Sequence, residues 1–176
     1  MKKYTKHKLK DLIDDQLFKF VFSHETLAKQ LINALGKYIN IDWDFSKVEL
    51  KIQQIIPGKH HDSKDYYADL MVVMKNSDVL LLEAYNKFRK KEFIKSKAYQ
   101  DRVFSERFEK GEEYEKPKRV IIVNFIRGNF DTNQILDKYG IVNLETLNDP
   151  IKDFNNCKLF IVVKVDKCLE GQYNED

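Results

Sequence analysis

The stretch YYADLMVVMKNSDVLLLEAYNKF, Tyr66 to Phe88, decides the fold class of this chain. Two apolar runs, Ala68–Met74 and Val79–Leu82, flank a polar turn, and this pattern predicts a buried β-hairpin. Asp69 lies in the first run and Glu83 closes the second. A carboxylate on a buried strand is costly unless a positive charge neutralises it. The pair therefore predicts a divalent cation with oxygen ligands, Mg²⁺ or Mn²⁺.

The register of the hairpin decides whether the two carboxylates lie on one face of the sheet. A two-residue turn pairs Asp69 with Ala84, whereas a three-residue loop pairs Asp69 with Glu83. Only side chains on the same face can share an ion, so we predict the three-residue loop, Lys75–Ser77. Two neighbouring carboxylates repel each other when no cation is bound, and we expect a raised pKa for at least one of them.

Length and composition indicate a single globular domain over residues 1–176, with 43% hydrophobic residues. Additional strands and a tail are expected over 127–176. The net charge of +3 is too small to indicate nucleic acid by itself. No apolar run approaches the roughly 20 residues that span a bilayer, and the lysine-rich N-terminus does not resemble a signal peptide. A cytoplasmic location without a membrane partner is expected, and Cys157 and Cys168 are interpreted as unpaired thiols.

Patterns of apolar residues predict the other elements. In chain order these are a helix over Asp14–Tyr38, capped by Asp14 or Asp15, a strand over Val48–Ile56, the hairpin, a helix over Arg89–Gly111, a strand over Val120–Ile126, a short helix within Asp131–Asp149 with a further strand at Gly140–Leu144, and a strand over Leu159–Val165. A helical crossover between the hairpin and the next strand implies a parallel strand pair. The prediction is an α/β fold with a mixed central sheet flanked by helices.

Lysine and arginine crowd the beginning of the second helix, at positions 87, 89, 90, 91, 95 and 97. Cations at a helix N-terminus oppose the macrodipole. Two interpretations stay open at this point: a solvated basic face, or a surface that binds an anionic partner.

The order of elements, with Asp on the second strand and Glu on the third, resembles the PD-(D/E)XK nuclease superfamily and its restriction-endonuclease-like core. Local motifs resemble the recombination-promoting nuclease family, whose members are often labelled transposases. The family's opening motif D-x-x-F-K-x-x-F is matched by Asp15, Phe18, Lys19 and Phe22, its L-x-N-A element by Leu31–Ala34, and its second-helix motif by Phe93, Lys95, Tyr99 and Gly111–Tyr114. The resemblance covers about Lys10 to Ile126.

This resemblance implies a metal-dependent DNA endonuclease that hydrolyses phosphodiester bonds. Mg²⁺ (or Mn²⁺) would be held by Asp69, Glu83 and the carbonyl group of Ala84, and would lower the pKa of a bound water. The lysines expected to contact DNA are Lys19, Lys95 and Lys97. Cleavage of both strands by one site per chain would favour a homodimer.

One departure from the family pattern concerns the third catalytic group. The pattern E-x-Q, or E-x-K in the wider superfamily, is Glu83-Ala84-Tyr85 here. Tyr85 is a poor base at neutral pH because its ordinary pKa is about 10. Lys87 lies two residues further on, is expected on the same strand face and is the other candidate for the missing catalytic group, while Tyr67 is expected opposite Tyr85. Three functions therefore stay open: a weak nuclease, a catalytically degenerate nuclease fold that binds DNA or a protein without cutting, and an interaction domain without nucleic acid.

Overall fold

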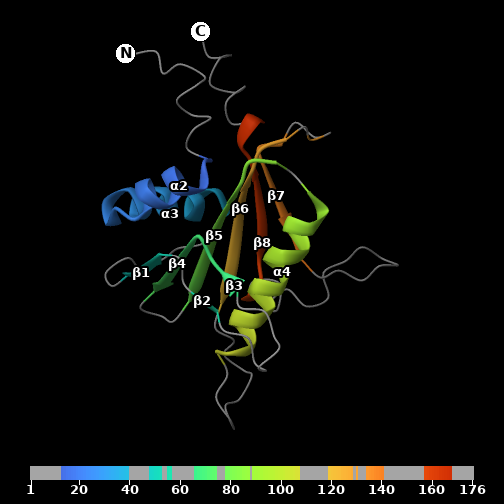
Figure 1. Cartoon of the computed structure of the whole chain (residues 1–176). Helices are drawn as coiled ribbons and strands as arrows, with labels where there is room; N and C mark the ends of the chain where they lie inside the picture. The colour runs from blue at the N-terminus through green and yellow to red at the C-terminus, as the bar shows by residue number, and fades with distance from the viewer. Residues whose placement is uncertain are drawn as a thin grey trace.

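The predicted hairpin forms two neighbouring strands of a six-stranded sheet in the computed structural model of this chain (Figure 1). The structure describes residues 13–39, 48–52, 55–56, 66–74, 78–87, 89–107, 119–128, 130, 134–140 and 157–167. In spatial order the strands are β1 (Val48–Ile52), β4 (Leu70–Met74), β5 (Val79–Tyr85), β6 (Val120–Ile126), β8 (Phe160–Lys164) and β7 (Leu136–Tyr139). Strands β2 (Ile55–Ile56) and β3 (Tyr66–Tyr67) form a separate two-stranded sheet.

The six-stranded sheet is mixed, as predicted. Strands β1, β4 and β5 pair antiparallel, β5, β6 and β8 pair parallel, and β7 pairs antiparallel with β8. The helix α4 (Lys90–Ser105) connects β5 to β6. It is the crossover that a parallel pair requires. The predicted parallel pair and the α/β class are therefore confirmed.

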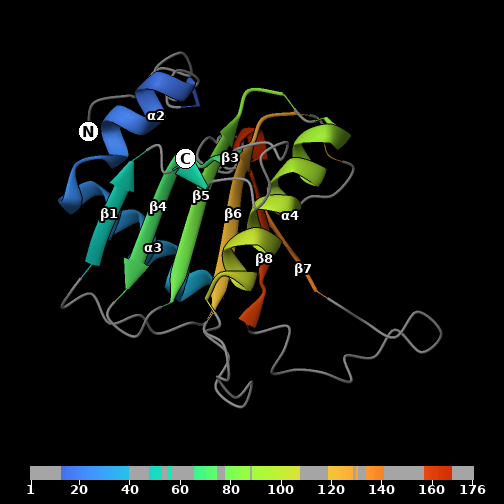
Figure 2. The same ribbon diagram turned by 60° about the horizontal axis from the view of Figure 1, so that its bottom comes forward.

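Helices cover both faces of the sheet (Figure 2). Helices α2 (Asp15–Phe22) and α3 (Glu25–Ile39) lie on one face, and α4 lies on the other. The prediction of one continuous helix over Asp14–Tyr38 is wrong, because the chain turns at Ser23 and His24. The Ser23 hydroxyl donates to the Phe20 carbonyl at 2.7 Å. Such local side-chain bonds compete with continued helical pairing.

The start of α2 is capped by Asp14, one of the two predicted candidates. Its carboxylate accepts a hydrogen bond from the backbone N–H of Gln16 at 3.1 Å. This satisfies a donor that has no partner inside the helix. The side chain of Asp15 lies outside the part of the chain that the structure describes.

Apart from Glu83 on β5 and Asn124 on β6, the two central strands are apolar up to their ends, and helices cover both of their faces. Leu80 and Leu82 of β5 pack toward α2 and α3, whereas Leu81 packs toward Tyr99 and Val103 of α4. Strands buried on two faces show a continuous apolar sequence instead of an alternating one. The predicted central strand Val120–Ile126 is confirmed.

The edge strand of the sheet was not predicted. Leu136–Tyr139 lies within the range Asp131–Asp149, where a short helix was expected, and forms the edge strand β7, which pairs with β8. The strand expected at Gly140–Leu144 lies outside the described residues, apart from Gly140 itself. Tyr67 pairs with Ile55 in the small sheet, and the ladder between β4 and β5 begins only at Leu70 and Leu82, so the described strand pairs do not include the expected pair of Tyr67 with Tyr85.

The second predicted helix, Arg89–Gly111, is shorter in the structure. Helix α4 ends at Ser105, and Gly111 lies outside the described residues. Within the described ranges, no helix has both the length and the apolar character needed to cross a membrane.

Candidate functional site

Asp69 and Glu83 lie opposite each other where strands β4 and β5 stop pairing. The ladder pairs Leu70 with Leu82, so the next position along places Asp69 opposite Glu83. This is the register that a three-residue loop predicts, and the prediction is confirmed at the level of strand pairing. The loop itself, residues 75–77, lies outside the described part. The strand register therefore brings the two carboxylates together.

Each acidic side chain accepts a backbone hydrogen bond from the neighbouring strand segment. The N–H of Asp69 donates to Glu83 Oε1 at 3.3 Å, and the N–H of Ala84 donates to Asp69 Oδ2 at 3.0 Å. Both residues are buried, with exposed fractions of 8% for Asp69 and 0% for Glu83. Side-chain oxygens thus take the place of ladder carbonyls at the end of the hairpin. Two carboxyl groups share one buried patch as a result.

Lys19 reaches this patch from helix α2. Its Nζ lies 3.1 Å from Asp69 Oδ1. The preceding residue, Phe18, is 2% exposed and packs its ring 5.5 Å from that of Phe125 on β6. The buried phenylalanine fixes α2 against the sheet, and the lysine beside it extends to the acidic pair. The structure therefore brings two residues of the opening motif, Phe18 and Lys19, to the site.

A chain of hydrogen bonds leads from Glu83 into the core. The Tyr85 hydroxyl donates to Glu83 Oε2 at 3.1 Å and lies 2.8 Å from Ser96 Oγ. Ser96 donates to Asn124 Oδ1 at 2.6 Å. Asn124 Nδ2 donates to the Ile161 carbonyl at 3.2 Å. The chain connects β5, α4, β6 and β8 in one polar path.

This path has more contacts than its hydroxyl groups have hydrogens. The Ile161 carbonyl accepts from the amide NH₂ of Asn124, which turns Oδ1 toward Ser96 and makes Ser96 the donor. Tyr85 and Ser96 each carry one hydrogen. Three contacts therefore share two hydrogens when Glu83 is ionised. A protonated Glu83 supplies the third.

The pKa of Glu83 agrees with this count. Burial, and next the negative charge of Asp69, raise the pKa of Glu83 from its ordinary value of 4.5 to about 8. The raised pKa expected for one member of the pair is confirmed. Without a cation, the neutral form of Glu83 predominates at pH 7.

Lys95 approaches the acidic pair from α4. Its Nζ lies 5.7 Å from the centre of the Tyr85 ring and 4.9 Å from that of Tyr99. Burial alone would lower the pKa of Lys95, but a hydrogen bond with Tyr99 and attraction to Glu83 and Asp69 outweigh it and raise the pKa. Lys95 therefore carries its positive charge beside the two carboxyl groups.

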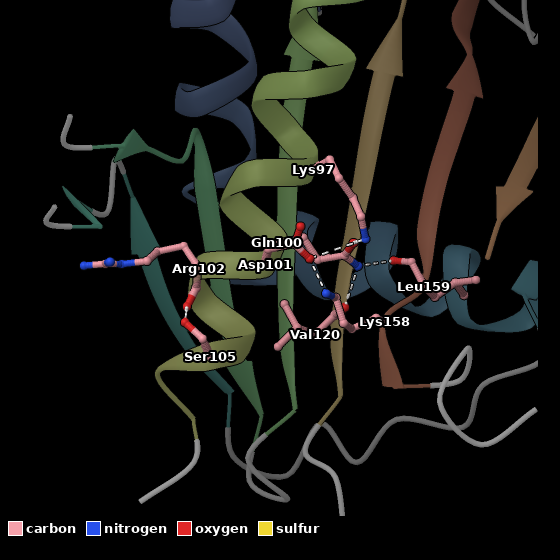
Figure 3. Close-up of polar contacts among 8 residues, drawn as sticks. All are labelled: Lys97, Gln100, Asp101, Arg102, Ser105, Val120, Lys158 and Leu159. Carbon is pink, nitrogen blue, oxygen red and sulfur yellow. Dashed lines mark hydrogen bonds and ion pairs between the residues drawn. The ribbon is translucent and has the colours of Figure 1, made fainter. Parts of the chain in front are cut away.

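Two of the predicted basic residues are placed differently. Strand β5 ends at Tyr85, so Lys87 lies beyond the strand and is exposed; its expected place on the strand face is wrong. Lys97 donates to Gln100 Oε1 at 3.1 Å and lies 3.5 Å from Asp101 (Figure 3). Gln100 bonds the Val120 carbonyl, at the end of β6 that is far from the acidic pair. Lys97 therefore belongs to a separate cluster on α4.

The protein ligands for a cation are few. Over the described ranges, no three His, Cys, Asp or Glu side chains form a group that could hold a metal ion. Among the residues that the structure describes, those that could hold a cation at this patch are Asp69, Glu83 and Ala84, the last through its carbonyl group.

Several buried polar residues were not anticipated from the sequence. These are Ser96 and Gln100 on α4, Asn124 on β6 and Lys164 on β8. Two signals were present. Asn124 interrupts the apolar run VIIVNFI, and Ser96 and Gln100 are four residues apart, which places them on one helix face.

Comparisons with protein-family models, with curated proteins and with solved structures find no match for this chain.

Proposed function

We propose that this protein is a metal-dependent DNA endonuclease of the PD-(D/E)XK type, which hydrolyses phosphodiester bonds. The observation that carries the proposal is the pairing of Asp69 with Glu83 in a buried patch that Lys19 and Lys95 approach from opposite faces of the sheet. The patch lies toward the carboxyl end of the parallel strand β5. Ligand sites of open α/β sheets gather at that edge.

The donor set suits Mg²⁺ or Mn²⁺. Two carboxyl groups and a backbone carbonyl are hard oxygen donors, which these ions prefer. The raised pKa of Glu83 shows that the patch favours removal of negative charge, and a bound cation would meet the same need. The ion would supply Lewis-acid stabilisation of the charge that develops on the scissile phosphate. Asp69 and Glu83 would hold the ion, and the Ala84 carbonyl would complete the protein ligands.

The basic residues around the patch suit a phosphate backbone. Lys95 is charged, exposed and beside the acidic pair, so it can contact a phosphate next to the cleaved bond. Lys19 is mostly buried and bonded to Asp69, and it would orient that carboxylate. Phosphate contacts by lysine provide affinity that is independent of sequence and weakens with salt.

Tyr85 limits the rate that this site can reach. Burial, and next the negative charge of Glu83, raise the pKa of Tyr85 above its ordinary value. The hydroxyl therefore stays protonated and cannot accept a proton from water. We expect cleavage by the wild-type protein to be weak.

Cleavage of supercoiled plasmid DNA with millimolar Mg²⁺ or Mn²⁺ tests the proposal. Asp69→Ala and Glu83→Ala should each reduce nicking at least about a hundredfold, since each removes a cation ligand. Glu106→Ala is the control, because Glu106 pairs with Arg102 at the end of α4 and should keep wild-type activity. Nicking that survives in both acidic-pair variants would reject the proposal.

A second candidate function is DNA binding without cleavage. It is favoured by Lys19, which already supplies a positive charge to Asp69, and by the engaged hydroxyl of Tyr85. Salt-dependent DNA binding that Lys95→Ala weakens, together with no cleavage in any variant, would support this candidate.

Replacement of Tyr85 separates the two candidates. Glutamine or lysine at this position keeps a donor beside Glu83 and restores the group that the family pattern has there. Tyr85→Gln and Tyr85→Lys should raise Mg²⁺-dependent nicking by up to about a hundredfold, the lower range of acid–base contributions. Robust nicking by the wild type that persists in Tyr85→Phe would contradict the expected weak cleavage and show that another group activates water.

A further inference from the structure

The hydrogen-bond path behind Glu83 is anchored to the centre of the sheet. Glu83, Ser96 and Asn124 are 0%, 0% and 1% exposed. Glu83 and Asn124 are direct partners on β5 and β6. The path ends on a backbone carbonyl, that of Ile161 on β8. A carboxyl group connected to a central strand in this way has little freedom to turn.

The Tyr85 side chain is held at two points by neighbouring residues of α4. The Ser96 hydroxyl lies 2.8 Å from the Tyr85 hydroxyl, and the Lys95 ammonium group lies over the Tyr85 ring. The tyrosine hydroxyl in turn donates to Glu83 Oε2. The helix therefore acts on Glu83 through the position of one aromatic side chain.

A second buried polar residue on the same helix has no part in this path. Gln100 lies one turn after Ser96 and is also 0% exposed. Its amide donates to the carbonyl groups of Val120 and Leu159 at 2.8 and 2.9 Å (Figure 3). These bonds connect α4 to the starts of β6 and β8. Gln100 thus provides a natural comparison: it is as buried as Ser96 but remote from the acidic pair.

We propose that Ser96 and Asn124 are positioning residues that hold the Glu83 carboxyl group in place for cation binding, and that they act through Tyr85. The inference rests on the proposed function, because it assumes a cation at Asp69 and Glu83. Partners behind a metal ligand orient it, and their loss commonly weakens metal affinity by about 10–100-fold. In this proposal Tyr85 connects Ser96 to Glu83 and so helps to hold the Glu83 carboxyl group. The Gln or Lys that the family pattern has at this position would act on water instead.

The test measures Mg²⁺ affinity directly, by calorimetry and by the shift of the melting temperature with Mg²⁺ concentration. We expect Ser96→Ala and Asn124→Leu to weaken Mg²⁺ binding about tenfold or more. Ser96→Thr keeps the hydroxyl and should bind Mg²⁺ like the wild type. Gln100→Leu should lower the melting temperature without Mg²⁺ and leave Mg²⁺ affinity unchanged. Ser96→Ala removes a single oxygen atom, so it remains informative if Asn124→Leu does not fold.

The possible results distinguish failure of the positioning role from failure of the proposed cation site. Wild-type Mg²⁺ affinity in Ser96→Ala, or an equal loss of affinity in Gln100→Leu, would overturn the positioning role alone. No Mg²⁺ binding by the wild-type protein would overturn the cation site and this inference together.

Discussion

Glutamine in place of Glu83 is expected to stabilise the cation-free protein by about 3–5 kcal/mol at pH 9 and to change its stability little at pH 4. The folded protein holds the pKa of Glu83 at about 8, whereas the ordinary value is 4.5. Between these two pH values the unfolded chain loses a proton that the folded chain keeps. The stability of the wild type therefore falls from about pH 4.5 upward, and this loss is complete above about pH 8.

Glutamine is neutral at every pH and carries an amide hydrogen that can replace the carboxylic acid proton in the path to Tyr85. Urea unfolding at pH 4, 6 and 9 in the presence of EDTA measures the effect. Glu25→Gln is the control, because Glu25 is exposed and pairs with Lys29 on the helix surface. Its effect should stay within about 1 kcal/mol at each pH. Stability curves of wild type and Glu83→Gln that run parallel from pH 4 to pH 9 would contradict the assigned pKa.

The sign of this effect bears on function. An acid that lowers stability at neutral pH gives no advantage to the fold, and such groups are found preferentially at functional sites. In the proposed nuclease, the cation would offset the penalty that Glu83 imposes. Mg²⁺ should therefore stabilise the wild type and have no such effect on Glu83→Gln.

Removal of Asp137 is expected to destabilise the protein by about 3 kcal/mol, at the lower end of the range for breaking a buried ion pair. Lys164, the last residue of β8, is 0% exposed, and its Nζ lies 2.7 Å from Asp137 Oδ1. The ammonium group also lies 5.5 Å from the centre of the Phe130 ring. Asp137→Ala leaves the Lys164 ammonium group buried without the carboxylate that offsets its charge.

Lys164→Met should cost less, because Asp137 is partly exposed and can be hydrated once the lysine is gone. The double variant Asp137→Ala with Lys164→Met should recover most of the stability lost in Asp137→Ala. Asp101→Ala is the matched control: Asp101 also pairs with lysines, Lys97 and Lys158, but at the surface, and its removal should cost less than about 1 kcal/mol. An equal cost for Asp137→Ala and Asp101→Ala would contradict the prediction.

The local pattern of apolar residues was sufficient to predict the strands at the centre of the fold. The run VIIVNFI is apolar at six of seven positions and has the length of a strand, a pattern that is typical of a strand covered on both faces. The sequence reduced the register of the hairpin to two alternatives, and the assumption of a shared cation selected the one that pairs Asp69 with Glu83. The helical crossover to β6, and hence the parallel pair, follows from the same local reasoning.

The surroundings of the acidic pair depend on contacts between segments that are distant in the sequence. Lys19 reaches Asp69 because Phe18 anchors α2 on one face of the sheet, and Ser96 reaches Tyr85 because α4 covers the other face. Spacing along the chain does not encode these distances, since they depend on the order of strands and on where each helix lies. The pairing of Lys164 with Asp137 likewise needed the edge strand β7, whose partner β8 comes later in the chain. Sequence alone therefore identified the two carboxylates and the two possible registers of their strands, whereas the folded structure decided the register and the charges and hydrogen bonds that surround them.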